Sequence, residues 1–204
     1  TFNILELIRE EKLHTHLMFF SSSTVYGDFL KPSVKEEDNV NPIGIYEATK
    51  VCGETLIKSY SNLVGINYTI FRPSALYGER CINNRVSQVL IERALMGKSL
   101  KLFGGGEEKL DFTHIDDVVQ GVYLALTNLQ QSKNQIFNLT RGNARPISDL
   151  VDMIKKEVGE VKIENLPRDK MRPKRGTLKI DKIKNLLGYS PKVDLSVGYK
   201  NYIN

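Results

Sequence analysis

The sequence predicts an α/β protein built on a parallel sheet, and three observations lead to this class. A short apolar run, Leu17–Phe20, has the length of a strand buried on both faces and is too short to cross a membrane. A helical pattern follows over residues 41–56, and a second strand pattern, Asn67–Arg72, ends at Pro73. A strand, a helix and a strand at this spacing form a right-handed parallel crossover.

Composition is typical of a globular protein of one to two domains. Hydrophobic residues make up 41% and charged residues 26% of the 204 positions. Two cysteines, Cys52 and Cys81, give no disulfide framework, which favours a reducing, cytoplasmic location. We find no signal peptide and no membrane-spanning run. The net charge is +5, but the basic residues are dispersed except at Arg168–Arg175, so we expect a small anionic ligand and no nucleic acid.

The first strand ends abruptly in hydroxyl groups. A helix is expected at Thr1–Lys12, before the strand, and a polar loop at Gly27–Val40, after it. Between the strand and the loop lie Ser21, Ser22, Ser23 and Thr24. Ligands of open parallel sheets bind outside the carboxyl ends of the strands. These hydroxyls are therefore expected at a ligand site.

The helix after the loop presents a tyrosine and a lysine on one face. Asn41 and Pro42 suit its cap and first turn, and a stripe of Ile45, Ala48, Cys52 and Leu56 is predicted to be buried. Tyr46 and Lys50, four residues apart, lie one above the other on a different line. A nearby ammonium favours the ionised form of a phenol, so the pair could transfer protons. The alternative is a solvated lysine beside a half-buried tyrosine.

The second half of the chain alternates between the two patterns. A hairpin or a loop turn is expected around Gly104–Gly106, between strand patterns at Leu100–Phe103 and Leu110–Phe112. The other expected elements, in chain order, are a helix at 86–96 ended by Gly97, a helix after Asp116 and Asp117, a strand at 135–139, a helix from Pro146 or Ser148 to Val158, a basic loop at 168–177, and a last helix from Asp181 to Gly188.

Neither the paired carboxylates nor the histidines indicate a metal site. Asp116 and Asp117 stand where carboxylates cap a helix and oppose its dipole, and we prefer that role to acid/base or metal chemistry. His14, His16 and His114 lack ligand spacing with any cysteine or carboxylate cluster. No metal is predicted.

A series of motifs in fixed order resembles the extended short-chain dehydrogenase/reductase family. It begins with Ser-Ser-x-x-Val-Tyr-Gly at 21–27 and Tyr-x-x-x-Lys at 46–50. The later motifs are Arg72–Gly78, Phe103–Gly106, Asp111–Asp117, Phe137–Leu139 and Leu186–Pro191. Within the family, the run of small hydroxyl residues is most similar to the UDP-sugar 4-epimerases of the UDP-glucose/UDP-galactose type.

This resemblance implies a Rossmann-like, doubly wound parallel sheet with a smaller α/β substrate-binding lobe. Residues 1–78 would be the C-terminal part of the dinucleotide-binding domain. Residues 79–204 would mainly form the substrate-binding lobe, with segments such as 111–140 returning to the first domain. The Gly-rich turn of the family does not occur in these 204 residues, so the resemblance implies that the N-terminal units of the sheet are absent.

The resemblance also implies a site for NAD, with NADP not excluded, and for a nucleotide-diphosphate sugar. The implied catalytic residues are Ser22 as hydroxyl clamp, Tyr46 as acid/base and Lys50 as its charge modulator and ribose anchor. The implied cofactor-binding residues are Ser21, Tyr46, Lys50, Pro73 and Ser74. The implied substrate-binding residues are Ser22, Ser23, Thr24, Ala75, Phe103, Arg172 and Arg175.

The reaction expected from the resemblance is 4-epimerisation. The dehydratases of the family have an Asp-Glu pair where this chain has Ser23 and Thr24, and a hydroxyl cannot replace a carboxylate base at neutral pH. A keto-sugar-nucleotide reductase, or a noncatalytic nucleotide-binding relative or fragment, is the alternative. Family pairing through the Tyr46 helix implies a homodimer.

Two departures bear on the substrate. Ala75 and Leu110 stand where relatives have Asn and Arg for the nucleotide or its diphosphate. Basic residues that could compensate are Lys109, Arg172, Lys174 and Arg175.

Overall fold

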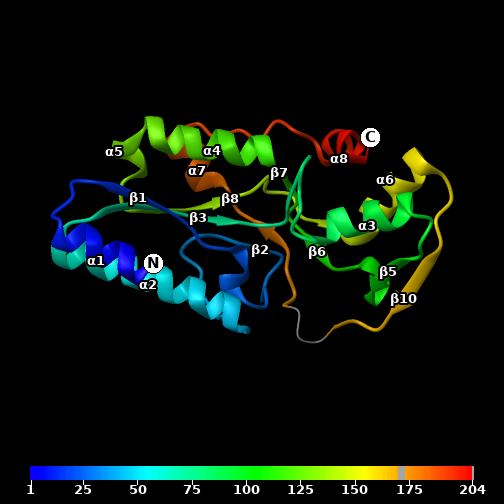
Figure 1. Ribbon diagram of the computed structural model, residues 1–204, viewed down its shortest axis with the longest axis horizontal. Coiled ribbons are helices and arrows are strands. Elements are labelled where there is room, and N and C mark those ends of the chain that lie inside the picture. The colour runs from blue at the N-terminus through cyan, green and yellow to red at the C-terminus, as the bar shows by residue number, and fades with distance from the viewer. Residues whose placement is uncertain (170–172, 204) are drawn as a thin grey trace.

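A computed structural model describes the chain at residues 1–169 and 173–203. Its centre is a sheet of three parallel strands in the order β1 (His16–Phe20), β3 (Asn67–Pro73), β8 (Gln135–Leu139). Phe20 lies opposite Phe71, and Phe71 lies opposite Phe137. Figure 1 shows this sheet with helices above and below it, and a second group of helices and strands at its carboxyl end. The predicted α/β class with a parallel sheet is confirmed.

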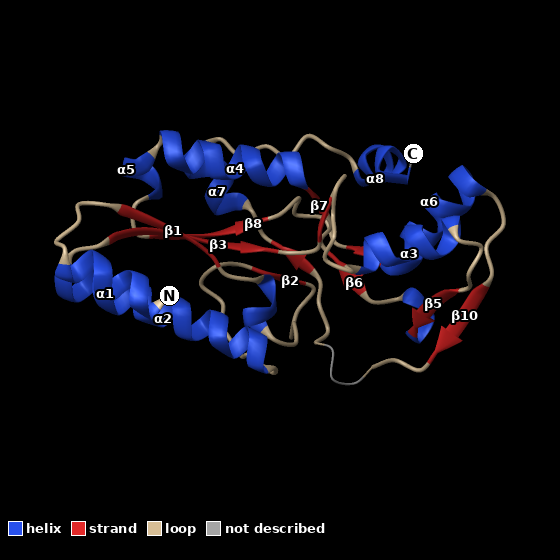
Figure 2. Ribbon diagram, viewed as in Figure 1, coloured by secondary structure: helices blue, strands red, loops and turns tan. Residues whose placement is uncertain are grey.

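Helices cover both faces of the sheet (Figure 2). On one face, α1 (Phe2–Glu10) and α2 (Ile45–Val64) pack Leu5 and Ile57 against Ile70 of β3. On the other face, α4 (Ile115–Thr127) and α7 (Asp181–Leu187) pack against Phe71 and Phe137. The short α5 (Leu129–Ser132) follows α4. Successive side chains of β3 therefore pack into two separate hydrophobic cores, one on each face of the sheet.

The predicted buried stripe of α2 is wrong. Ile45 is 86% exposed and Cys52 is exposed, whereas Gly53, Glu54 and Ile57 are buried. Gly53 leaves room for the ring of Phe19, whose Cζ would lie 2.7 Å from an added Cβ. The spacing of apolar residues predicted one buried face of the helix, but the close contact between Gly53 and Phe19 turns a different face toward the sheet. The helix also starts later than expected, at Ile45 after Gly44.

The strand β1 is less buried than predicted. All of its residues but the last are partly buried, and Phe20 is 41% exposed. The reason is topological, because β1 lies at the edge of the described sheet and β3 at its centre. The loop after it contains β2 (Ser33–Val34), which pairs in parallel with β11 (Thr177–Leu178).

The second group of elements has its own core. Leu100, Phe112, Leu150 and Tyr199 are among its fully buried side chains. This core is built from α3 (Val86–Leu95), α6 (Ile147–Val158), α8 (Leu195–Ile203) and the short strands and loops around them. The helix α8 was not predicted. It is short, and Gly198 interrupts its apolar pattern.

The predicted hairpin does not form. The strand β5 (Leu100–Phe103) pairs in parallel with β10 (Ile163–Leu166), and β6 (Lys109–Leu110) pairs antiparallel with β9 (Arg145–Pro146). Between them, η2 (Gly104–Gly106) has three glycines with positive φ. This 3₁₀ turn sends the two strands to different partners. The remaining pair joins β4 (Leu76–Tyr77) and β7 (Thr113–His114) in parallel.

Candidate functional site

The hydroxyl residues after β1 form a short 3₁₀ turn, η1 (Ser23–Tyr26). Ser22 caps it, because its Oγ accepts a hydrogen bond from the Thr24 N–H at 3.2 Å and lies 2.8 Å from Thr24 Oγ1. Gly27 ends the turn with φ +65°, and an added Cβ there would meet the carbonyl oxygen of Asn41. The turn is thus held at the carboxyl end of β1, where the sequence places the ligand site.

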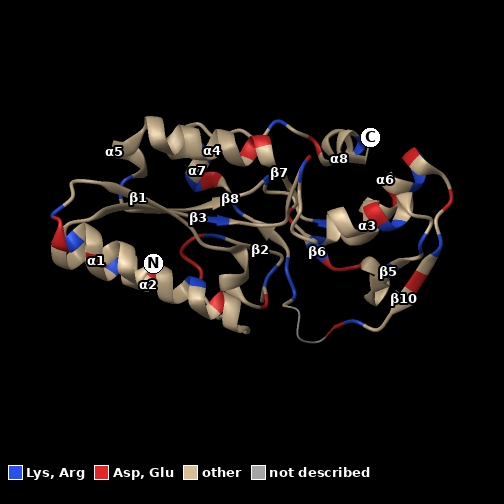
Figure 3. Cartoon of the chain, viewed as in Figure 1, with Lys and Arg blue, Asp and Glu red and all other residues tan. Residues whose placement is uncertain are grey.

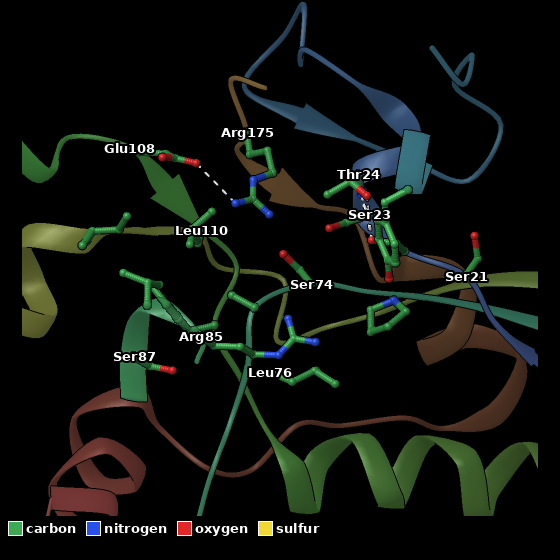
Figure 4. Close-up of a pocket in the computed structure, with 17 residues that line it drawn as sticks. Ser21, Ser23, Thr24, Ser74, Leu76, Arg85, Ser87, Glu108, Leu110 and Arg175 are labelled. Carbon is green, nitrogen blue, oxygen red and sulfur yellow. Dashed lines mark hydrogen bonds and ion pairs between the residues drawn. The ribbon is translucent and has the colours of Figure 1, made fainter. Parts of the chain in front are cut away.

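A cavity of about 400 Å³ lies beside this turn, between the two groups of elements (Figure 4). Nine of the residues predicted for the site line it: Ser21, Ser22, Ser23, Thr24, Tyr46, Pro73, Ser74, Ala75 and Arg175. The other lining residues are Leu76, Arg85, Val86, Ser87, Glu108, Leu110, Phe112 and Ile147. The carboxyl ends of β1 and β3 and the starts of α2, α3 and α6 thus meet at one place.

Tyr46 and Lys50 have the relation that their spacing predicts. Tyr46 lies in the first turn of α2 and is 55% exposed, and its side chain lines the cavity. The Nζ of Lys50 is 5.6 Å from the centre of the Tyr46 ring and donates a hydrogen bond to the carbonyl oxygen of Phe20 at 2.8 Å. Lys50 therefore joins α2 to the end of β1, behind the cavity.

Other predicted residues lie elsewhere. Phe103 ends β5 and is not among the described residues that line this cavity. Arg172 lies outside the described residues. Lys109 lines a different cavity of about 410 Å³, and the backbone N–H of Lys174 donates a hydrogen bond to Asp28. Ala75 and Leu110 present only apolar side chains to the site.

Three charged side chains line the cavity, and two of them were missed. Arg175 forms an ion pair with Glu108 at 3.3 Å, and Arg85 lies just before α3. Figure 3 shows that basic and acidic residues are otherwise spread over both parts of the molecule. Arg85 and Glu108 belong to none of the motifs. The one signal for Arg85 was its position directly before the predicted helix at 86–96.

A buried ion pair anchors α2 behind the site. Arg72 of β3 donates two hydrogen bonds to Glu54 of α2, at 2.9 and 2.7 Å, and both side chains are almost fully buried. Arg72 also donates to the hydroxyl of Tyr26 at 2.9 Å and to the carbonyl oxygen of Glu36. Burial opposes the charge on Arg72, yet the bonds to Glu54 raise its pKa. Burial raises the pKa of Tyr26 to about 12.

Asp111 is a fully buried carboxyl group between Leu110 and Phe112, two residues that line the cavity. It accepts hydrogen bonds from the backbone N–H groups of Leu178 and Gly142 and from the hydroxyl of Thr140. Burial raises its pKa to about 6, although these bonds work in the opposite direction. Asp111 thus ties β11, and with it the segment that carries Arg175, to the strand region after β8.

The paired carboxylates lie in the first turn of α4, where they oppose its dipole as expected, but the predicted capping role is wrong. Asp117 accepts the backbone N–H groups of Lys192 and Val193, and the side chain that caps the helix is His114, through Nδ1 and the Asp116 N–H. No cluster of three metal-ligating side chains occurs in the part of the chain that the structure describes. Within the same residues, every helix is too short or too polar to cross a membrane.

The fold and the cavity define an α/β protein with a hydroxyl-lined site at the carboxyl end of a parallel sheet. Residues 1–140 match the model of the NAD dependent epimerase/dehydratase family. The chain belongs to this family.

Several proteins are similar along almost the whole chain. A protein of Methanocaldococcus jannaschii, provisionally named a UDP-glucose 4-epimerase, is 34% identical over all of this chain and 67% of its own length. A UDP-glucuronate 4-epimerase of Arabidopsis thaliana is 28% identical over 98% of this chain. The chain spans only half of that plant relative.

Solved structures of proteins with similar names superimpose on this chain. The UDP-glucuronic acid 4-epimerase of Bacillus cereus, in complex with UDP-glucuronic acid and NAD, superimposes with a TM-score of 0.91 at 31% identity. The match covers 98% of this chain and 64% of that one. The UDP-glucose 4-epimerase of Thermotoga maritima, with UDP-glucose, gives a TM-score of 0.88 at 28% identity over 98% of this chain and 65% of that one.

Proposed function

We propose that this chain forms the proton-transfer and substrate-binding side of an NAD-dependent nucleotide-sugar 4-epimerase. One observation carries the proposal: the hydroxyls of Ser22, Thr24 and Tyr46 line a single cavity, with the ammonium of Lys50 5.6 Å from the Tyr46 ring. Relatives and similar structures named as UDP-sugar 4-epimerases support the same reaction. The homodimer expected from the sequence stays a prediction.

In this proposal the residues of the chain hold a sugar hydroxyl and move its proton. Ser22 hydrogen-bonds the hydroxyl that reacts, and Tyr46 takes its proton and later returns it. Lys50 places a positive charge 5.6 Å from the centre of the Tyr46 ring, beside the group that transfers the proton. Ser23 and Thr24, which also line the cavity, supply no carboxylate for the elimination of water.

The residues beside the hydroxyl turn fit a nicotinamide cofactor. Ser21 is almost fully buried and lines the cavity, and its Oγ has no hydrogen-bond partner among the described residues. Pro73 and Ser74, also predicted for this role, lie at the end of the neighbouring strand. Ser21, Pro73, Ser74 and Tyr46 would hold the group, and NAD, when bound, supplies a hydride acceptor.

The test is Tyr46→Phe in the full-length protein. This change removes only the hydroxyl, so we expect turnover of a UDP-hexose to fall by roughly 10²–10⁴-fold while nucleotide-sugar binding is kept. Tyr123→Phe, an exposed tyrosine on α4, is the matched control and should keep full activity. Activity close to wild type in Tyr46→Phe would refute the assignment.

Product analysis separates the epimerase from the reductase. A 4-epimer formed without net consumption of the cofactor supports the proposal. Net oxidation of one NAD(P)H for each sugar reduced supports the keto-sugar reductase instead.

A further inference from the structure

The proposed site contains a guanidinium group that the motifs do not account for. Arg85 lines the cavity, and no hydrogen bond or ion pair to its side chain occurs in the described part of the chain. Figure 4 shows this side chain running from the start of α3 toward Leu76 and the middle of the site. An unpaired cation beside a polar cavity is available to an anionic ligand.

The other described charged groups near the cavity are either paired or do not line it. Two guanidinium groups and one carboxylate line the cavity, which leaves a net charge of +1. Arg175 shares its charge with Glu108, at 3.3 Å. Lys109 and Lys174, considered from the sequence as substitutes for the missing cation at Leu110, do not line the cavity. Arg85 is therefore the cavity cation without a carboxylate partner among the described residues.

We infer that Arg85 binds an oxyanion of the nucleotide sugar and so helps to determine which substrate is accepted. The inference rests on the proposed function, because it presupposes that a nucleotide sugar occupies this cavity. The ligand offers two oxyanions of suitable chemistry, the diphosphate and, in a hexuronate, the carboxylate of the sugar. The planar fork of an arginine makes two parallel hydrogen bonds to either group.

The position of Arg85 suits this role. Its backbone is extended, with φ −72° and ψ 156°, and it directly precedes α3. The next two residues, Val86 and Ser87, belong to the first turn of α3 and also line the cavity. The helix therefore holds the backbone of Arg85 at the edge of the cavity. Arg85 itself is exposed, so its replacement should leave folding unaffected.

The experiment measures equilibrium binding by calorimetry, with UDP-glucose and UDP-glucuronic acid as probes. The full-length protein is compared with Arg85→Gln, Arg85→Lys and Arg80→Gln. The last variant removes the same charge from an exposed arginine five positions earlier, which does not line the cavity. We expect Arg85→Gln to weaken binding by about 10- to 100-fold, as for the loss of a charge-assisted hydrogen bond. Arg85→Lys should fall between Arg85→Gln and the wild type.

The pattern across the two probes identifies the oxyanion. An equal loss for both sugars supports contact with the diphosphate, and a loss for UDP-glucuronic acid only supports contact with the carboxylate. Unchanged binding of both probes by Arg85→Gln overturns the inference and leaves the proposed function intact. An equal loss in Arg80→Gln also overturns it, because the effect would then be one of net charge. A wild-type protein that binds neither probe overturns both.

Discussion

At the scale of single residues, the site depends on polar groups whose surroundings decide their charge. Tyr46 and Arg85 stand at an open cavity, whereas Asp111 is enclosed and surrounded by N–H and O–H donors. Desolvation is the larger effect on Asp111, so its pKa rises to about 6 from an ordinary value of 3.8. A buried carboxyl group of this kind changes charge within a mildly acidic range.

The stability of the protein should therefore depend on pH through Asp111. The folded state holds the proton more tightly than the unfolded state, so this contribution is fully present below about pH 4 and is lost as the pH rises through about 6. We expect the free energy of unfolding of the wild type, measured in urea relative to Asp111→Asn, to fall by roughly 1–3 kcal/mol between pH 4 and 7. A difference that is flat or rises with pH would contradict this.

At the scale of elements, the cavity depends on the sharp turn that follows β1. The turn η1 must leave β1 sharply to place its hydroxyls beside α2. Gly27 permits this with φ +65° and ψ −139°, and its missing side chain leaves space for the carbonyl oxygen of Asn41. Gly65, which ends α2 with φ +76°, has no atom within 4 Å of an added Cβ. Gly27 is therefore required both by its backbone conformation and by a close contact, whereas Gly65 is required by its backbone conformation alone.

Gly27→Ala should be more damaging than Gly65→Ala. Both introduce a side chain at positive φ. For Gly65, in the left-handed region, this costs roughly 1–2 kcal/mol, and for Gly27, whose ψ of −139° is sparsely populated by other residues, it costs roughly 1–3 kcal/mol. Only Gly27→Ala adds a clash with backbone, so we expect its loss of unfolding free energy to exceed that of Gly65→Ala by at least about 1 kcal/mol. It should also weaken nucleotide-sugar binding, because the hydroxyl turn shifts. Equal losses in chemical denaturation would show that Asn41 moves aside freely.

Much of the site could be predicted because its signals are local. The hydroxyl run at 21–24 and the four-residue spacing of Tyr46 and Lys50 needed only a strand end and a helix. Arg85 and Glu108 could not be found this way, since they reach the cavity from segments that only tertiary packing brings together. The hairpin expected around Gly104 failed for a similar reason: alternation predicted the strands, but not that each has a distant partner.

At the scale of the whole molecule, buried polar contacts join segments that are far apart in the sequence. Arg72 links β3 to Glu54 of α2 and to Tyr26 of η1, and Tyr26 donates a hydrogen bond to Asn138 of β8. The network therefore fixes the helix of Tyr46 against the sheet and against the hydroxyl turn. Losing one member leaves the other charges buried without a partner.

Glu54→Ala should accordingly destabilise the protein by about 3–5 kcal/mol, the cost of leaving a buried charge unpaired. Glu157→Ala is the control, because Glu157 pairs with Lys200 at the surface and such pairs contribute about 0–1 kcal/mol. Urea or thermal unfolding measures both changes. Similar losses in the two variants would mean that the Arg72 network contributes little more than a surface pair.

The two edges of the central sheet differ in one respect with practical consequences. At β8, the carboxylate of Glu36 accepts the backbone N–H of Asn138, and the Asn138 side chain bonds to Lys179. At β1, the side-chain hydrogen bonds among the described residues are one from Lys50 to the carbonyl oxygen of Phe20 and one between His16 and Thr69 of β3, and the strand has no lysine, glutamate or proline. Unpaired backbone N–H and C=O groups on an apolar edge strand can form hydrogen bonds to a strand of another chain. At high concentration, we expect the chain to self-associate along the open edge of β1.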